Sequence, residues 1–292
     1  MTGKSTSIII RTFNEERYLP SLLRSIPEQA DSETIIVDSG STDNTKAVAK
    51  SFDCRIIDIE KNDFSFGRSL NYGCAAAQGD YLVFISGHCV PATEQWLSSL
   101  VLPLAEGRAV YCYGRQLGDD DSCFSEQQLF RRRYPEENEM RNFEFFCNNA
   151  NAALSRSVWE KYRFDEELTG LEDMELAKRL IMDGFSVQYV FDAPVFHHHH
   201  ESWKMVKRRY EREALALQHI MPEIHVSFSD FLRYFFGSTL SDFGAALQER
   251  CLTKNVGQIV LFRLMQYWGT YLGNHEHRKM SRARKEYYFY PK

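Results

Sequence analysis

Long hydrophobic runs are missing from this chain of 292 residues. No stretch of 18 or more consecutive apolar residues occurs, so the sequence predicts no transmembrane helix. Cysteine pairs with CxxC spacing are also missing, and the seven cysteines are odd in number. The first residues are polar and lead directly into a strand-like segment, which is not typical of a signal peptide. We therefore expect reduced thiols and a cytoplasmic protein.

Charge is present in ordinary amount but is unevenly distributed. The chain carries 35 Lys and Arg against 40 Asp and Glu, a net charge of −5. Residues 1–200 have a net charge of −11, whereas residues 201–292 have +6. The basic end predicts contact with an anionic partner. Nucleic acid is not the partner we expect, because the body is acidic and no known nucleic-acid-binding motif is recognisable.

The first hundred residues alternate apolar, β-branched segments with helical patterns. This order predicts an α/β fold with a mostly parallel sheet that is covered by helices on both faces. The expected strands are Ser7–Phe13, Thr34–Asp38, Arg55–Ile59 and Tyr81–Ser86, and the expected helices are Glu15–Ile26, about Thr42–Phe52, and Arg68–Ala77.

The pattern is weaker further along the chain. Between Ala109 and Arg133 no element is clear, and Cys147–Tyr162 resembles a polar loop that leads into a helix. An amphipathic helix is predicted at Leu171–Met182, a strand at Ser186–Val190, and a long basic helix at Glu201–His219. The rest consists of aromatic amphipathic segments and a basic tail.

Three predicted strands end in polar residues. These endings are Thr12-Phe13-Asn14, Asp38-Ser39-Gly40 and Ser86-Gly87-His88. In open α/β sheets, ligands bind beyond the carboxyl ends of the strands, so the three endings predict one shared cleft.

Five segments together resemble glycosyltransferase family 2. They are SIIIRTFNEERYL at 7–19, IIVDSGSTDNT at 35–45, GDYLVFISGHCVP at 79–91, FDEELTGLEDMELAKRL at 164–180, and the four histidines at 197–200. The resemblance implies a GT-A α/β/α sandwich over residues 1–220, with a nucleotide-sugar half at 1–115 and an acceptor half at 116–220. Residues 221–292 would then form a helical C-terminal extension.

The resemblance also implies an activity. FSFGRSLN and the histidine-rich segment are most similar to bacterial enzymes of surface-polysaccharide synthesis, including rhamnosyltransferases. We therefore expect inverting transfer of a sugar from a UDP- or dTDP-sugar to a saccharide or lipid-linked saccharide. Two alternatives compete: an inactive GT-A protein that serves as a binding scaffold, and a nucleotidyltransferase. The second would carry a Gly-rich basic loop after the first strand, and RTFNEE is not one.

The resemblance places a set of residues around the donor. They are Thr12, Phe13, Glu15, Asp38, Ser39, Arg68, Ser86, Gly87 and His88. Asp38 would accept a hydrogen bond from the base or the ribose; its alternative role is in a turn. Arg68 would contact the diphosphate, or else it is a solvated helix charge. Glu15 would flank the donor, or else serve the start of the following helix.

The metal position departs from the family. Where members usually have Asp-x-Asp, this chain has Ser86-Gly87-His88. Either His88 binds a divalent cation such as Mn²⁺ or Mg²⁺, or other groups hold the metal, or the enzyme works without one. His197 and His199 are the further candidate ligands, because alternate residues of an extended segment share a face.

Glu172 and Asp173 match the family's catalytic Glu-Asp pair. Asp173 is the expected general base, since adjacent carboxylates raise each other's pKa whereas the helix start lowers it. The alternative is that acidic residues simply favour the first turn of a helix. Asn149, Asn151 and Trp203 are the expected acceptor contacts, although the asparagines also suit turns.

The apolar segment Gly257–Leu272 is followed by several basic residues. This combination suits the surface of an anionic membrane, where a lipid-linked acceptor would be presented. Helices that pack on the catalytic domain, or on a second subunit in a homodimer, explain the segment equally well.

Overall fold

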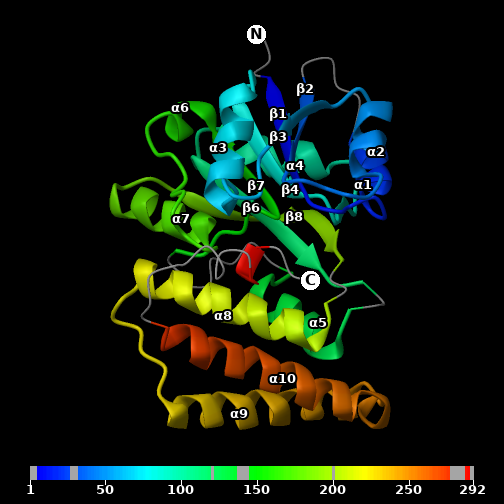
Figure 1. The fold of residues 1–292 in the computed structure, drawn as a ribbon, viewed down its shortest axis with the longest axis vertical. Helices are drawn as coiled ribbons and strands as arrows, with labels where there is room; N and C mark the ends of the chain where they lie inside the picture. Colours follow the sequence, from blue (N-terminus) through cyan, green and yellow to red (C-terminus); the bar gives the residue numbers. More distant parts are fainter. Residues whose placement is uncertain are drawn as a thin grey trace. The chain divides into compact units, whose positions relative to one another are not determined.

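The computed structural model describes residues 5–26, 32–119, 122–136, 145–198, 201–276 and 287–289. The chain divides into two compact units (Figure 1). The first, here called the sheet unit, consists of Met1–Leu117, Tyr134–Glu167 and Glu172–His198. The second, the helical unit, consists of Gly118–Arg133, Leu168–Leu171 and His199–Lys292.

One eight-stranded sheet forms the centre of the sheet unit within the described residues. Its order is β3-β2-β1-β4-β7-β6-β8-β5, and the first four of these strands run parallel. The strands are β1 Thr6–Thr12, β2 Ser32–Asp38, β3 Arg55–Asp58, β4 Tyr81–Ser86, β5 Cys89–Pro91, β6 Tyr111–Leu117, β7 Asn151–Ser155 and β8 Val187–His197. The predicted mostly parallel α/β sheet is confirmed.

Parallel pairing brings the polar strand ends together. Thr12 at the end of β1 is paired with Asp38 of β2, and Arg11 is paired with Ser86 of β4. The central residues of the three strands, at positions 8–10, 35–37 and 82–85, are apolar and buried, so the register is fixed by the core and the polar ends emerge at one edge of the sheet.

Helices cover both faces of this sheet. They are α1 Leu19–Ser25, α2 Thr45–Ser51, α3 Phe66–Ala76, α4 Trp96–Ala105, α6 Arg156–Trp159 and α7 Glu172–Met182. Residues of α1, α2 and α4 join Ile8 and Ile10 in one core cluster. On the opposite face, Gly73 of α3 lies against Ile9, where a Cβ would overlap the isoleucine side chain.

Three predictions of local structure were wrong or incomplete. The expected polar loop after Cys147 contains strand β7, which pairs antiparallel with both β4 and β6 and is buried. The unclear region before Arg133 contains β6 and helix α5 Phe124–Arg133. The strand expected to end at Val190 continues to His197, because its second half pairs with β5 and with the end of β6.

The helical unit contains α5 together with α8 Trp203–Ile220, α9 Phe228–Gln248 and α10 Leu252–Asn274. Figure 1 shows α8 and α10 side by side. Their backbones lie very close, because a Cβ at Gly269 would overlap the carbonyl of Lys207, and one at Gly273 would overlap that of Glu211. Two glycines one turn apart therefore define this helix contact.

A buried ion pair joins α9 to α10. Asp242 and Arg263 are both fully buried, and the Nε of Arg263 donates to Oδ2 of Asp242 at 2.7 Å. A second nitrogen of Arg263 donates to Oδ1 at 2.9 Å, and Arg132 of α5 reaches the same oxygen at 3.0 Å. Among the helices of the described residues, none is long and apolar enough to cross a membrane.

Candidate active site

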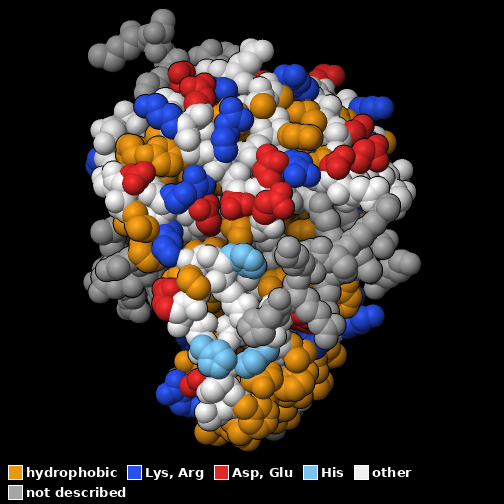
Figure 2. All heavy atoms as spheres, turned by 60° about the vertical axis from the view of Figure 1, so that its left-hand side comes forward, with side chains coloured by type: hydrophobic (Ala, Val, Ile, Leu, Met, Phe, Trp, Pro, Cys, Tyr) orange, Lys and Arg blue, Asp and Glu red, His pale blue; other side chains and the backbone are white. Residues whose placement is uncertain are grey.

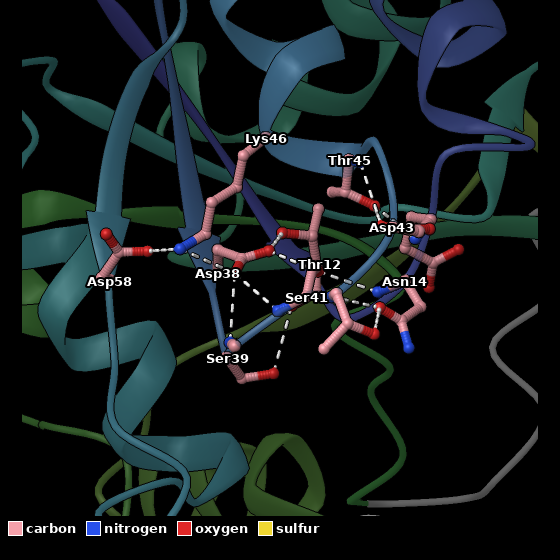
Figure 3. Close-up of polar contacts among 12 residues, drawn as sticks. Thr12, Asn14, Asp38, Ser39, Ser41, Asp43, Thr45, Lys46 and Asp58 are labelled. Atoms are coloured by element: carbon pink, nitrogen blue, oxygen red, sulfur yellow. Dashed lines mark hydrogen bonds and ion pairs between the residues drawn. The ribbon is translucent and has the colours of Figure 1, made fainter.

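The turn after β2 is organised by Asp38, which is fully buried. Its Oδ1 accepts the backbone N–H groups of Gly40 at 3.1 Å and Ser41 at 2.9 Å. Its Oδ2 accepts the hydroxyls of Thr12 at 3.0 Å and Ser41 at 2.6 Å (Figure 3). The acceptor capacity of both oxygens is thus used within the protein, so Asp38 shapes the turn, and its predicted hydrogen bond to the donor stays a prediction.

The ends of β1 and β2 are also joined directly. The carbonyl oxygen of Thr12 accepts the backbone N–H of Ser39 at 3.0 Å and the Ser39 hydroxyl at 3.1 Å. Asn14 has a φ of 59°, a left-handed conformation that asparagine tolerates, and its Oδ1 accepts the N–H of Thr42 at 2.8 Å. The two loops therefore form one connected surface at the sheet edge (Figure 3).

A cation and an aromatic ring lie beside this turn. The Nζ of Lys61 is 5.4 Å from the centre of the Phe13 ring. Gly40, with a φ of +90°, leaves room for the same lysine, since a Cβ there would lie 3.1 Å from Lys61 Cε. Lys61 was not singled out from the sequence, because no motif surrounds it. A ring beside a positive charge suits a nucleotide, with its aromatic base and its phosphates.

Four side chains form a continuous chain across the strand ends. Glu15 Oε1 lies 2.7 Å from His88 Nδ1, and His88 Nε2 lies 3.0 Å from His197 Nε2. His197 Nδ1 in turn lies 2.7 Å from Gln116 Oε1. Gly87 permits this arrangement, because a Cβ there would come within 2.8 Å of the Glu15 side chain. The predicted residues Glu15, His88 and His197 are therefore brought together, and Gln116 joins them.

The histidine pair fits part of a metal site. Two ring nitrogens that bind one metal at about 2.0–2.1 Å lie roughly 3 Å apart, as the two Nε2 atoms do. Glu15 and Gln116 occupy the opposite ring nitrogens, as outer partners of metal-binding histidines usually do. Within the described residues, no group of three or more His, Cys, Asp or Glu could hold a metal ion. Further ligands would come from a bound diphosphate, from water or from a residue outside the described ones. His199 lies outside the described residues.

Asp173 stands in the first turn of α7 and is buried. Its Oδ2 accepts the backbone N–H of Asn149 at 2.9 Å, and its Oδ1 accepts that of Met174 at 2.8 Å. Burial raises the pKa of Asp173 to about 7, and the neighbouring Glu172 carboxylate contributes to the increase. A carboxylate with this pKa can accept a proton near neutral pH, as a general base must.

Arg11 contacts both the Glu172 carboxylate and the backbone of Gly87, the residue before His88. Its NH1 lies 3.1 Å from Oε1 of Glu172, and its guanidinium stacks 5.0 Å from the Phe66 ring centre. Its own carbonyl oxygen accepts the N–H of Gly87 at 3.2 Å. Sequence reasoning missed Arg11, although a charged residue inside the apolar run of β1 was an available signal. Leu171, just before Glu172, has a φ of 57°, which is strained for a leucine.

The two asparagines predicted to contact the acceptor, Asn151 and Asn149, differ in how many of their side-chain hydrogen bonds are formed within the protein. Asn151 is fully buried; its side-chain oxygen accepts from Trp96, and its nitrogen donates to the carbonyls of Arg115 and Ala193. These bonds give Asn151 a structural role. Asn149 receives the Tyr111 hydroxyl on Oδ1 at 2.5 Å. Its buried Nδ2 has no partner among the described residues, so an amide hydrogen-bonding position remains next to Asp173.

The remaining predicted contacts interact with residues outside this group of side chains. Arg68 is bound to Glu166 at 2.7 Å and to the carbonyl of Asp63 at 2.8 Å. Ser86 donates its backbone N–H to Ala150. Trp203 is the first residue of α8 and belongs to the helical unit. The ligand contacts of Arg68, Ser86 and Trp203 stay predictions.

Two sequence relatives are O-antigen chain rhamnosyltransferases. The O-antigen chain rhamnosyltransferase WbaN of Salmonella anatum is 28% identical over 61% of this chain and 60% of its own length. The O-antigen chain rhamnosyltransferase RfbN of Salmonella typhimurium is 27% identical over 70% of this chain and 69% of its own. The chain thus spans less than two thirds of the first relative.

Solved structures share the fold. A mannosyltransferase from Pyrobaculum calidifontis, solved with GDP-Man and Mn²⁺, has a TM-score of 0.60 at 17% identity and covers 92% of this chain and 85% of its own. Glucosyl-3-phosphoglycerate synthase from Mycobacterium tuberculosis, solved with Mn²⁺, UDP and phosphoglyceric acid, has a TM-score of 0.56 at 19% identity, with 75% and 78% covered. At these identities, the likeness shows the fold alone, which is GT-A.

The family model for glycosyl transferase family 2 matches residues 7–163, more than half of the chain. This span contains all three polar strand ends, the histidine at the Asp-x-Asp position, and strand β7. The segment with Asp173 follows it directly along the chain. The protein therefore belongs to glycosyl transferase family 2.

Proposed function

We propose that this glycosyltransferase moves a sugar from a UDP- or dTDP-sugar to a saccharide or lipid-linked saccharide, with inversion at the anomeric carbon. The observation that carries the proposal is Asp173. It is a buried carboxylate with a pKa near neutrality that accepts two backbone N–H groups, and its neighbour Glu172 is bound by Arg11 near the end of β1.

In the proposed reaction, an acceptor hydroxyl attacks the anomeric carbon from the side opposite the diphosphate. The new C–O bond forms as the bond to the diphosphate oxygen breaks, and the hydroxyl proton passes to a carboxylate oxygen of Asp173. The two N–H groups on Asp173 fix the direction of its oxygens. Arg11 holds Glu172 beside it, so the second carboxylate cannot turn away.

His88 and His197 would hold a divalent cation, with Glu15 and Gln116 fixing the orientation of their rings. Such a cation would offset negative charge on the departing diphosphate. Because two neutral imidazoles supply no negative charge, the diphosphate itself would provide much of the attraction for the metal. Lys61 and Arg68 are the protein's own positive charges proposed to support the phosphates.

A deoxyhexose is the sugar that we propose first, because the two O-antigen relatives are both rhamnosyltransferases by name. The setting proposed is bacterial surface-polysaccharide synthesis. The test is a panel of UDP-, dTDP- and GDP-sugars with a saccharide acceptor, with or without Mn²⁺, in which acceptor-dependent release of the nucleoside diphosphate is measured. Nucleotide binding by folded protein without transfer from any donor would contradict catalysis and favour the scaffold alternative.

We also propose that the helical unit lies on an anionic membrane surface. Large apolar side chains are exposed along α9: Phe228, Leu232, Phe236, Leu240 and Leu247. Figure 2 shows hydrophobic side chains gathered over the lower part of the molecule, the part that contains α9 and α10 in Figure 1. An apolar surface of this kind on a positively charged segment suits the headgroup region of a membrane. A homodimer through the same surface is the competing proposal.

A further inference from the structure

Arg208, in the middle of α8, is buried and has no carboxylate partner among the residues that the structure describes. Only 6% of the residue is exposed, yet it forms no hydrogen bond or ion pair with any residue that the structure describes. The ring of Tyr287 covers its guanidinium, with the ring centre 4.1 Å from the guanidinium carbon. Buried guanidinium groups are ordinarily paired, because desolvating an unpaired charge is strongly unfavourable.

The basic residues beside Arg208 on α8 do have partners. Lys207 lies 3.3 Å from Glu211, and Arg209 lies 2.8 Å from Glu126. The carboxylates of Glu211 and Glu126 therefore pair with other cations. No carboxylate of the described residues therefore compensates the charge of Arg208.

Arg208 lies in a row of positive charge. Lys204 is one turn before it and Arg212 is one turn after it, so the three residues share a face of the helix. Lys204 is exposed and has no ion pair among the residues with described positions. The backbone carbonyl of Arg212 accepts the Thr169 hydroxyl at 3.0 Å, which fixes this turn of α8 against the segment Leu168–Leu171.

We propose that Arg208 binds a phosphate group, with Lys204 and Arg212 adding positive charge and Tyr287 covering the guanidinium. A guanidinium presents parallel N–H groups that match two phosphate oxygens, and a partly desolvated one gains most from that pairing. The phosphate belongs either to a lipid-linked acceptor or to a soluble phosphate compound. The site lies wholly within the helical unit and does not depend on the proposed sugar transfer.

The test uses the full chain with inorganic phosphate and pyrophosphate as probes. Wild-type protein should bind them in calorimetry and unfold at a higher temperature in their presence than in sodium chloride of equal ionic strength. Arg208→Met should bind at least tenfold more weakly and lose the thermal shift. Without phosphate it should unfold at a higher temperature than wild type, because an unpaired buried charge has been removed.

Lys254→Met is the matched control, since it removes an exposed positive charge from α10 in the same unit. It should bind phosphate as wild type does. Equal loss in both variants, an unchanged phosphate response in Arg208→Met, or no binding to wild type would each overturn the proposal. Arg208→Gln, which keeps a polar side chain, repeats the test if the methionine variant does not fold.

The source of the phosphate is resolved by a second probe, a short polyprenyl phosphate in neutral detergent. Binding that is tighter than that of inorganic phosphate, and lost in Arg208→Met, assigns the site to a lipid-linked ligand. Equal affinity for both probes, again lost in Arg208→Met, assigns it to soluble phosphate compounds. Binding of the lipid that survives Arg208→Met would contradict the assigned site.

Discussion

Asp173 shows how one residue is prepared for proton transfer by its surroundings. Its pKa of about 7 predicts that kcat falls as the pH decreases below neutrality, because the base becomes protonated. Asp173→Asn should reduce kcat by about 10²–10⁴-fold at pH 8, the usual contribution of a general base. Nucleotide affinity should change only a few-fold. A pH series of kcat for wild type and variant tests this, and a variant that retains a tenth of the activity would remove Asp173 from the role.

The same residue predicts a pH-dependent stability. A carboxyl whose pKa is higher in the folded chain binds more protons there than in the unfolded chain between about pH 4 and pH 7. Ionised Asp173 therefore destabilises the fold above pH 7, and this effect disappears toward pH 4. Asparagine has one side-chain oxygen where aspartate has two, so one of the two backbone N–H groups loses its acceptor. This loss lowers the free energy of unfolding by about 1–3 kcal/mol at every pH.

The test therefore compares how the free energy of unfolding of wild type and of Asp173→Asn changes with pH. Between pH 5 and pH 8, the free energy of unfolding of Asp173→Asn should rise relative to wild type by about 2–3 kcal/mol, because about two units of the raised pKa lie above pH 5 and one pKa unit corresponds to about 1.4 kcal/mol. Urea unfolding at both pH values measures it. A difference that stays constant with pH would show that the pKa of Asp173 is not raised by folding.

The sequence located those site residues that are marked by local motifs. Asp173 and His88 were found because they occupy positions in recognisable segments, and His197 because it follows a strand. Arg11 and Gln116 were missed, since their roles depend on side chains 161 and 81 positions away. Asp38 was found, but its internal hydrogen bonds could not be seen in the sequence.

At the scale of elements, the α8–α10 contact predicts opposite effects for two glycines of one helix. Gly269→Ala would push a Cβ into the backbone of α8 and should destabilise the protein by about 1–3 kcal/mol or more. Gly257→Ala, in the same helix with no atom near its Cβ position, should stabilise it by roughly 0.5–1 kcal/mol. Chemical unfolding compares them. Equal effects would contradict the close contact of the two backbones.

The Asp242–Arg263 pair predicts strong coupling between α9 and α10. In Arg263→Met, buried Asp242 keeps only Arg132 as a positively charged partner. The substitution should lower the free energy of unfolding by about 3–5 kcal/mol. The double variant Asp242→Leu with Arg263→Met should recover much of this loss, because the one charge left without its partner, Arg132, is exposed to solvent. A double-mutant cycle of unfolding free energies measures the coupling. Purely additive losses would show that the two residues do not act as a pair.

A strand could be predicted from the sequence where both of its faces are buried, because its residues then form a continuous apolar segment. This holds for β1, β2 and β4, whose central residues are fully buried. Strand β7 was missed because its first residue is a buried asparagine, whose hydrogen bonds come from distant parts of the chain. The start of α1 was placed at Glu15 but is at Leu19, since residues 15–18 form a turn whose N–H groups bond to the β2–α2 loop.

For the whole molecule, the exposed apolar surface of α9 predicts how the protein meets a membrane. Leu240 is 66% exposed, so Leu240→Glu should leave stability unchanged. It should weaken binding to vesicles that contain phosphatidylglycerol by at least about tenfold, through lost apolar burial and charge repulsion. Gln248→Glu, at the exposed end of the same helix, is the control with the same added charge. Unchanged sedimentation of Leu240→Glu with vesicles would favour the homodimer proposal.

The helical unit is assembled from three separated pieces of chain, and this affects its biosynthesis. Helix α5 is translated early, but its Arg132 binds an aspartate that lies 110 positions later. At typical elongation rates, that partner emerges on the order of ten seconds afterwards. The buried side chains of α5 remain exposed on the ribosome throughout that interval, whereas every segment of the sheet unit has been synthesised by His198. If translation stalled after α5 but before this aspartate, the side chains of α5 that are buried in the folded protein would remain accessible to chaperones.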